Sequence, residues 1–359
     1  MKYILFFCLC LPVRSTAQPI PPYQNLALEG GGIRGIAYAG VFAVLEQKGI
    51  LQNIEKVAGS SAGAIAGLMI SLGYQAGEID SMMAELRIQE FNDGGGGALG
   101  KYIRVKNNYG LYKGERFEKW LQMLVAGKTG NPLLSFAALH QLKQQNPLLK
   151  DLYVTGTNLS KQQLQIFSHE HSPQMPIALA VRISSSIPFY FEPIALNNRF
   201  EEIKKDADSS LEVNYYIDGG LLCNYPVGMF DSCENKENPL NCFDATLNPL
   251  TLGIKLERPE QIDSLKNNSI AIPPYHPQNL QEYFAAFSNL LIETLSRKYP
   301  NLANERGRTI YVSYGNIEST PRKMKPHEKK LLYDNGVKAA LAFFDEASTT
   351  TLYQKPSAK

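Results

Sequence analysis

The sequence has little histidine, and neither its histidines nor its cysteines follow a metal-binding pattern. Five histidines are scattered along 359 residues, at His140, His169, His171, His276 and His327. Downstream of residue 17 there is no His-Glu-x-x-His or Cys-x-x-Cys spacing, the patterns typical of zinc sites. None of the five lies in a motif that would place the base of a catalytic triad. The sequence therefore predicts no metal site and no cofactor, and it favours structural or surface positions for the five imidazoles.

A net charge of either sign is also missing. The whole chain carries 36 basic and 34 acidic residues. Lys2 and Arg14 both lie in an N-terminal segment that we expect to be removed, which leaves the two signs balanced. Proteins that bind nucleic acid usually carry a basic excess. We therefore expect no nucleic-acid partner, and the sequence gives no indication of the oligomeric state.

Long apolar runs are absent except at the N-terminus. Tyr3–Val13 is apolar, follows Lys2 and is followed by the small residues of Ser15–Ala17. This pattern is typical of a secretory signal peptide, here residues 1–17, and the run is too short to span a membrane. We expect a secreted or periplasmic protein after cleavage near Ala17, rather than a cytoplasmic one.

Cysteine is scarce in the remaining chain, where three residues are left. Cys233 and Cys242 lie in one polar loop and could form a disulfide in an oxidising compartment. Cys223 follows an aspartate motif, and we expect it to be buried beside that motif.

The chain does contain a G-x-S-x-G motif in a strand–turn–helix context. Gly59–Gly63 is preceded by the β-type segment Ile54–Ala58 and followed by the apolar segment Ala64–Ile70. A nucleophile elbow needs this context, because it holds its serine in a strained turn at the start of a helix. The N-terminal amides of that helix favour a developing negative charge. The motif predicts Ser61 as a nucleophile.

A second glycine motif, Gly30–Gly35, lies one βα unit upstream. Its spacing also matches a dinucleotide fingerprint, in which the loop would bind a pyrophosphate at a helix N-terminus. The same bare amides could instead form an oxyanion hole, with Arg34 adding a positive charge. The glycine pattern fits both functions, and the elbow in the next βα unit favours the oxyanion hole.

A third motif, Asp218-Gly219-Gly220, ends a β-type segment at residues 213–217. By itself it would be read as a turn in which Asp218 caps the backbone. In this order with the two upstream motifs, it predicts a carboxylate directed into a cleft. Burial beside apolar neighbours would raise the pKa of that carboxyl group.

These motifs, in this order, resemble the patatin-like phospholipase family. The matching stretches are Gly30–Gly35, Gly59–Gly63 and Asp218–Gly220, with supporting likenesses at Tyr109–Gly114 and Ser184–Pro188. The motif glycines are Gly30, Gly35, Gly59, Gly63, Gly219 and Gly220. The likeness covers roughly residues 24–257 and, more weakly, the C-terminal part.

The resemblance implies hydrolysis of lipid acyl esters by a serine–aspartate dyad without histidine. Ser61 would be the nucleophile and Asp218 the base. The implied oxyanion hole consists of the amides around Gly31, Gly32 and Ile33, with Arg34 nearby. The implied partner is a lipid or phospholipid substrate, met at a transient membrane or micelle surface.

Alternating β-type and helical segments predict an α/β fold. Strands are expected near 25–29, 54–58, 151–157, 213–217, 250–256 and 309–314. The resemblance implies three α/β/α layers with a mainly parallel central sheet, in an acyl hydrolase domain at residues 24–257. Residues 258–347 are expected to form a helix–strand–helix unit packed on the same domain, with its first helix near 277–299. Residues 348–359 are expected to be a disordered tail.

Two further segments allow alternative interpretations. Residues 92–100 contain four consecutive glycines and are expected to be a surface linker or, alternatively, the hinge of a lid. Residues 114–125 carry apolar side chains at helical spacing, which we expect to pack in the core rather than to contact lipid. These side chains are Phe117, Trp120, Leu121 and Leu124.

Two other functions remain open on the sequence. One is an α/β-hydrolase esterase with a Ser-His-Asp triad, in which one of the five histidines would be essential. The other is a non-enzymatic protein that binds lipid or nucleotide through the glycine loop.

Overall fold

The computed structural model describes residues 23–203, 212–232, 246–266, 305–319 and 321–350, with isolated residues between 274 and 290. The expected signal peptide, the Cys233–Cys242 disulfide and most of the helix expected near 277–299 lie outside the described residues.

A mainly parallel sheet of eight strands lies at the centre of the described part of the chain. Its parallel strands are, in spatial order, β10 (Thr309–Ser313), β9 (Thr251–Glu257), β1 (Asn25–Leu28), β2 (Lys56–Gly59) and β4 (Asp151–Asn158). Three antiparallel strands complete it, namely β8 (Asn214–Asp218) and β7 (Ile194–Leu196) beyond β4, and β5 (Gln163–Phe167) paired with β4. A separate parallel pair is formed by β3 (Gly110–Tyr112) and β6 (Phe189–Phe191). All six strands expected from the sequence are present.

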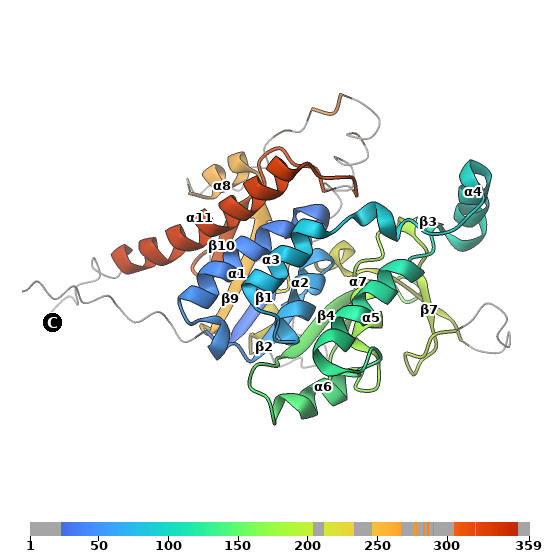
Figure 1. Cartoon of the computed structure of the whole chain (residues 1–359), viewed down its shortest axis with the longest axis horizontal. Helices are drawn as coiled ribbons and strands as arrows, with labels where there is room; N and C mark the ends of the chain where they lie inside the picture. The colour runs from blue at the N-terminus through green and yellow to red at the C-terminus, as the bar shows by residue number, and fades with distance from the viewer. Residues whose placement is uncertain are drawn as a thin grey trace, which may run out of the picture.

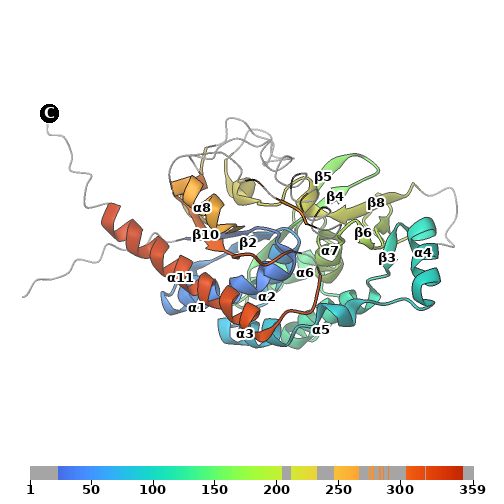
Figure 2. The same cartoon turned by 90° about the horizontal axis from the view of Figure 1, so that it is seen from above.

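The sheet is a buried layer between helices, as the alternating pattern predicted. Every residue of β1 and of β4 is buried, which is typical of parallel strands covered on both faces. The helices are α1 (Ala37–Gln47), α2 (Ala62–Ser71), α3 (Ala76–Glu85), α4 (Gly97–Asn108), α5 (Glu115–Thr129), α6 (Phe136–Lys143), α7 (Ile177–Ser184), α8 (Pro259–Lys266) and α11 (Pro326–Thr350). Figures 1 and 2 show α1, α2, α3 and α11 together on one side of the sheet and α8 on the other.

The C-terminal region adds a strand and a long helix to the same fold. Strand β10 pairs with β9, and α11 packs along α1 (Figure 1). This packing is close, because a Cβ atom at Gly40 would lie 2.0 Å from the carbonyl oxygen of Tyr333. Helix α11 begins at Pro326 and continues to Thr350, so residues 348–350 of the expected tail are helical.

The glycine-rich segment at 92–100 is not simply a linker, because α4 begins within it at Gly97. Two side chains fix the segment. The carboxylate of Asp93 accepts hydrogen bonds from the backbone N–H groups of Gly114 (2.8 Å) and Arg116 (3.0 Å). The guanidinium of Arg104 donates to the carbonyl oxygen of Gly95 at 2.7 Å. The alternative as a lid hinge stays a prediction.

The apolar stripe on α5 packs as expected. Phe117, Leu121 and Leu124 are buried in the main core, and Trp120 is half-buried against it. None of the helices in the described ranges is both long and apolar enough to cross a membrane.

Candidate active site

Ser61 occupies a strained turn between β2 and α2. Its backbone angles are φ 49° and ψ −120°, in the positive-φ region that side chains rarely adopt. Gly63 permits the turn, because a Cβ atom there would lie 2.3 Å from the carbonyl oxygen of Leu28 in β1. A Cβ atom at Gly59 would be equally crowded, because it would lie 2.3 Å from the carbonyl oxygen of Gly63. This is the geometry expected of a nucleophile elbow.

The carboxylate of Asp218 lies directly beside the Ser61 hydroxyl. Asp218 is the last residue of β8, and the Ser61 hydroxyl donates to its Oδ2 at 2.8 Å. Its Oδ1 accepts the backbone N–H of Gly220 at 2.7 Å, within the short 3-10 turn Gly219–Leu221. A Cβ atom at Gly219 would lie 2.3 Å from the carbonyl oxygen of Thr155, so β4 and this turn are in close contact.

Burial changes the acidity of Asp218. It raises the pKa of this carboxyl group from 3.8 to about 7, although the hydrogen bonds from Gly220 and Ser61 lower it. A carboxylate with a pKa near neutrality is a much stronger base than an exposed aspartate. The direction agrees with the expectation from the sequence.

Three consecutive serines, Ser184–Ser186, at the C-terminal end of α7 hold both residues, a role that the sequence analysis did not assign to them. The backbone N–H of Ser61 donates to the hydroxyl of Ser184 at 2.9 Å, and the hydroxyl of Ser185 donates to the carbonyl oxygen of Ser61 at 3.3 Å. The carbonyl oxygen of Ser186 accepts the backbone N–H of Asp218 at 3.0 Å. The stretch that supported the family resemblance therefore fixes the distance between Ser61 and Asp218.

A buried arginine links this serine stretch to the other supporting motif. Arg182 in α7 donates to the hydroxyl of Ser186 and to the carbonyl oxygens of Lys113 (2.8 Å) and Gly114 (3.1 Å). Its guanidinium also lies 4.7 Å from the ring centroid of Phe191. Burial lowers the pKa of this group to about 10, so it stays charged at neutral pH.

The glycine loop packs against the elbow. A Cβ atom at Gly30 would lie 3.1 Å from the Cβ of Ser61, and one at Gly35 would lie 3.0 Å from the Cβ of Ala62. A side chain that the sequence analysis missed, Asn224, also holds the loop. Its side-chain amide donates to the carbonyl oxygen of Gly30 at 3.1 Å, and the backbone carbonyl oxygen of Asn224 accepts the Gly30 N–H at 2.9 Å.

The four residues expected to form an oxyanion hole are not equivalent. The N–H of Ile33 donates to the carbonyl oxygen of Ser319 at 3.4 Å, and that of Arg34 donates to the carbonyl oxygen of Gly31 at 3.2 Å. The amides of Gly31 and Gly32 make no hydrogen bond to the described part of the chain. The amide of Ile33 is therefore already engaged with the C-terminal segment, whereas those of Gly31 and Gly32 are not engaged with the described residues. The assignment of the oxyanion hole stays a prediction.

The positive charge expected near the oxyanion is also engaged elsewhere. The Arg34 side chain donates to the carbonyl oxygen of Ile317 at 2.7 Å, and its guanidinium stacks 3.6 Å from the ring centroid of Tyr314. It therefore fastens the glycine loop to the segment after β10. The amide of Ala62, at the start of α2, is a further candidate donor, because no hydrogen bond joins it to the described residues.

A cavity of about 670 Å³ opens at Ser61. Ser61, Ala62 and Gly32 line one end. Its apolar wall includes Ile65, Met83, Leu86, Phe117, Trp120 and Phe191. Its charged residues are Glu85, Arg87, Glu90, Arg322, Lys323 and Lys329. The volume falls within the range of about 300–1,000 Å³ that is usual for small-molecule sites. Phe117 and Trp120 thus combine core packing with a place on the cavity wall, and their contact with lipid stays a prediction.

No histidine contacts the Ser61–Asp218 pair, although all five lie in described residues. His140 and His169 lie beside Asp151, at the N-terminal end of β4, whereas Ser61 follows the C-terminal end of the parallel neighbour β2. The ring of His171 is hydrogen-bonded to Ser168 at 2.8 Å. His276 and His327 are exposed. The geometry gives no support to a Ser-His-Asp triad.

Comparison with known proteins extends the likeness over most of this fold. A family model described as patatin-like phospholipase matches residues 26–231, more than half of the chain. YqhO of Bacillus subtilis is 33% identical over 232 residues, which cover 63% of this chain and 72% of that protein. The probable lipid hydrolase 463L of Invertebrate iridescent virus 6 is 28% identical over 223 residues, which cover 60% of this chain and 66% of that protein.

Among solved structures, VipD from Legionella pneumophila aligns over 91% of this chain and 67% of its own length, with a TM-score of 0.53 and 19% sequence identity. This similarity concerns the fold alone. The family model, in contrast, spans the sequence from β1 through the elbow to Asp218 and beyond. The match covers more than half of the chain and includes the glycine loop, the elbow and Asp218, so the chain belongs to the patatin-like phospholipase family.

Proposed function

We propose that the protein hydrolyses carboxyl esters of lipids, as a phospholipase A or lysophospholipase, through Ser61, Asp218 and an acyl-enzyme intermediate. Family membership supports a lipid ester hydrolase. The observation that carries the finer proposal is the 2.8 Å hydrogen bond from the Ser61 hydroxyl to Asp218, on a strained elbow at the end of an apolar cavity.

In the first half of the reaction, Asp218 accepts the proton of the Ser61 hydroxyl as the Ser61 oxygen attacks the ester carbonyl carbon. The proton then passes to the departing alcohol, and the acyl group remains on Ser61. In the second half, Asp218 takes a proton from water as the water oxygen attacks the acyl carbon, and it returns this proton to the Ser61 oxygen as the fatty acid leaves. A pKa of about 7 suits both directions of transfer, because the group can accept and return a proton near neutral pH.

The negative oxygen of the tetrahedral intermediate needs donors that are free when it forms. Gly31 and Gly32, and the amide of Ala62 at the start of α2, are the donors that we assign to it. Each such donor is worth about 10²–10³ in rate in comparable hydrolases. In this proposal Arg34 acts on the reaction through the loop that it fastens, not through direct contact with the oxyanion.

The cavity suits an acyl chain with a polar group near its mouth. Its apolar wall would hold the hydrocarbon, and the basic side chains at Arg87, Arg322, Lys323 and Lys329 would favour an anionic headgroup. Arg322 is paired with Glu328 at 2.7 Å, and Lys329 donates to the carbonyl oxygen of Leu86 at 3.1 Å. Arg87 lies 3.6 Å from the carboxylate of Glu90, so Lys323 is the better candidate for a phosphate.

Helix α4 provides a surface for a lipid aggregate. Leu99 and Tyr102 are 69% and 64% exposed, and Ile103 beside them on the same helical face is exposed as well. We call these three residues the α4 surface. Segment 97–114 contains four basic residues and no acidic one, although the chain as a whole is nearly neutral. Figures 1 and 2 show α4 standing out from the body of the molecule. Exposed apolar side chains with basic neighbours suit an anionic lipid surface.

Secretion or periplasmic export belongs to the same proposal, on the basis of the N-terminal apolar run. A comparison of the N-terminal residue of the protein in the medium, the periplasm and the cytoplasm of an expressing cell tests it. A mature N-terminus near Gln18 outside the cytoplasm is the expected result.

Labelling with a fluorophosphonate probe tests the nucleophile. Ser61→Ala should abolish both labelling and ester hydrolysis, while Ser60→Ala should retain them. Ser60 is a matched control, because its hydroxyl is buried beside Ser61 and has no hydrogen-bond partner among the described residues. Labelling that survives in the Ser61→Ala variant would exclude Ser61 as the nucleophile.

A further inference from the structure

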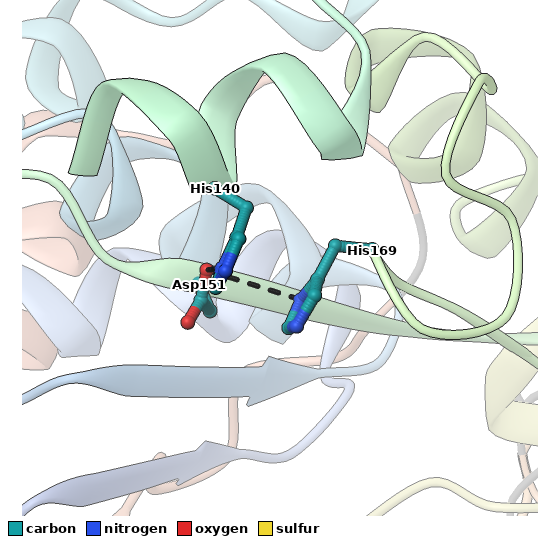
Figure 3. A group of neighbouring side chains, drawn as sticks. All are labelled: His140, Asp151 and His169. Atoms are coloured by element: carbon teal, nitrogen blue, oxygen red, sulfur yellow. Dashed lines mark hydrogen bonds and ion pairs between the residues drawn. The ribbon is translucent and has the colours of Figure 1, made fainter. Parts of the chain in front are cut away.

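A second cluster of reactive side chains lies at the N-terminal end of β4, whereas Ser61 lies at the C-terminal ends of the parallel strands. His140 from α6, Asp151 at the start of β4 and His169 from the loop after β5 point toward one another (Figure 3). Nδ1 of His140 lies 2.8 Å from Oδ1 of Asp151, and Nδ1 of His169 lies 3.8 Å from the same oxygen. The two imidazole rings stack with their centroids 4.1 Å apart. Three potential ligand atoms therefore converge from three separate segments.

One of these atoms lacks a partner. Nδ1 of His169 is buried and makes no hydrogen bond within the described part of the chain. A buried ring nitrogen without a partner loses its interaction with water and gains nothing in return. A neutral imidazole nitrogen carries a lone pair suited to a metal ion.

We propose that His140, Asp151 and His169 bind a divalent transition-metal ion of the zinc type. Zinc bonds to imidazole nitrogen and carboxylate oxygen are about 2.0–2.2 Å long, which in a tetrahedral site places neighbouring ligand atoms about 3.3 Å apart. The observed separations of 2.8 and 3.8 Å lie on either side of that value. Imidazole ligands favour zinc-type ions over magnesium or calcium.

The surroundings of the three ligands support the proposal. Lys143 donates to Oδ2 of Asp151 at 2.8 Å, which leaves Oδ1 facing the two rings. On the other side of the His169 ring, Nε2 lies 3.7 Å from the carboxylate of Glu170. The hydroxyl of Tyr153 donates to the same carboxylate at 2.7 Å. Ligating histidines usually direct their second nitrogen toward such a carboxylate.

The expected role of the ion is structural. The side chain of Asp151 is 3% exposed and that of His140 is 39% exposed, so an ion can enter from solvent and reach the buried carboxylate. Binding would tie α6 and the loop after β5 to the start of β4. Since Ser61 follows the C-terminal end of the neighbouring strand, the ion is expected to change stability and not ester hydrolysis.

Zinc titration of the full chain tests the site. After treatment with a chelator, the protein should bind one Zn²⁺ with a Kd of about 1 μM or tighter, measured by competition with a chromophoric chelator. At a free Zn²⁺ concentration of about 100 times Kd, its unfolding temperature should rise by about 5 °C. Ester hydrolysis should be the same with and without Zn²⁺, so this result is independent of the proposed reaction.

Variants distinguish this site from adventitious binding. His169→Ala and the bulkier His169→Gln should each weaken Zn²⁺ binding by at least about 10–100-fold and abolish the thermal shift. His171→Ala is the matched control, because His171 lies in the same loop and contacts Ser168 instead of Asp151. Absence of Zn²⁺ binding to the wild-type protein would overturn the proposal, as would equal binding by the His169→Gln and His171→Ala variants.

Discussion

Replacing Asp218 with asparagine should inactivate the protein and at the same time stabilise it. The fold holds this carboxyl group in a buried place that raises its pKa from 3.8 to about 7. A raised pKa means that the folded state favours the neutral form, so ionisation of Asp218 costs stability. That cost is absent below pH 3.8, grows as the pH rises and is complete above pH 7.

The magnitude follows from the shift. About three pKa units at about 1.4 kcal/mol each give a cost of about 4 kcal/mol at pH 8, and only about 2 kcal/mol at pH 5. Asparagine has the same shape and no charge, and its oxygen can still accept the N–H of Gly220. The variant should therefore unfold about 6 °C above the wild type at pH 8 and about 2 °C above it at pH 5. Its rate of ester hydrolysis should fall by about 10²-fold or more.

Thermal unfolding at the two pH values, with hydrolysis of a soluble short-chain ester, measures both effects. Asp151→Asn, studied in the presence of a chelator, is a control of opposite sign. Burial would raise the pKa of Asp151, but hydrogen bonds from Lys143 and His140 hold it below its usual value, so loss of this charge should destabilise the fold at pH 8. An Asp218→Asn variant that is less stable than the wild type at pH 8, or equally shifted at both pH values, would refute the reasoning.

Three further predictions concern the loop, the serine stretch and the α4 surface. Gly32→Val should lower both activity and unfolding temperature, because Gly32 has a φ of +56° and a Cβ atom there would lie 2.2 Å from the carbonyl oxygen of Ser319; normal stability would contradict this. Ser184→Ala should lower kcat by about 10-fold with little change in KM, because it removes the acceptor that orients the Ser61 N–H; an unchanged kcat would exclude a positioning role. Replacing the three residues of the α4 surface with serine should weaken co-sedimentation with anionic vesicles but not hydrolysis of a soluble ester, and Leu148→Ser, at an equally exposed leucine, should do neither; unchanged co-sedimentation would exclude this surface.

The sequence was sufficient to predict the sheet and the order of the three motifs. Residues 152–155 of one strand segment are all apolar, aromatic or β-branched, which is typical of buried parallel strands. The elbow could be recognised because its glycines are required locally, as Gly63 shows by its contact with Leu28. Ser61 and Asp218 could be paired only through the family resemblance, because 157 positions separate them in the chain.

Contacts between distant segments account for what the sequence did not predict. Ser319 accepts the amide of Ile33, and Ile317 accepts the side chain of Arg34, but both come from a C-terminal segment that no local pattern links to the glycine loop. The cluster of His140, Asp151 and His169 was missed for the same reason. Zinc motifs that a sequence reveals place their ligands a few residues apart, whereas these three residues come from a helix, a strand and a loop.

The proposed dyad would also explain why the site has so many supporting contacts. A histidine between serine and aspartate would let the carboxylate stay ionised and fully hydrogen-bonded at some distance from the substrate. Here Asp218 itself must be a strong enough base, and burial achieves this by destabilising its ionised form. A buried carboxylate of this kind would move away from Ser61 or take up water unless its backbone were fixed. The carbonyl oxygen of Ser186 accepts the backbone N–H of Asp218 at 3.0 Å, and the hydroxyl of Thr157 donates to the backbone carbonyl oxygen of Asp218 at 2.8 Å. Rigid attachment of the β8 end is thus the structural condition for a base of this strength.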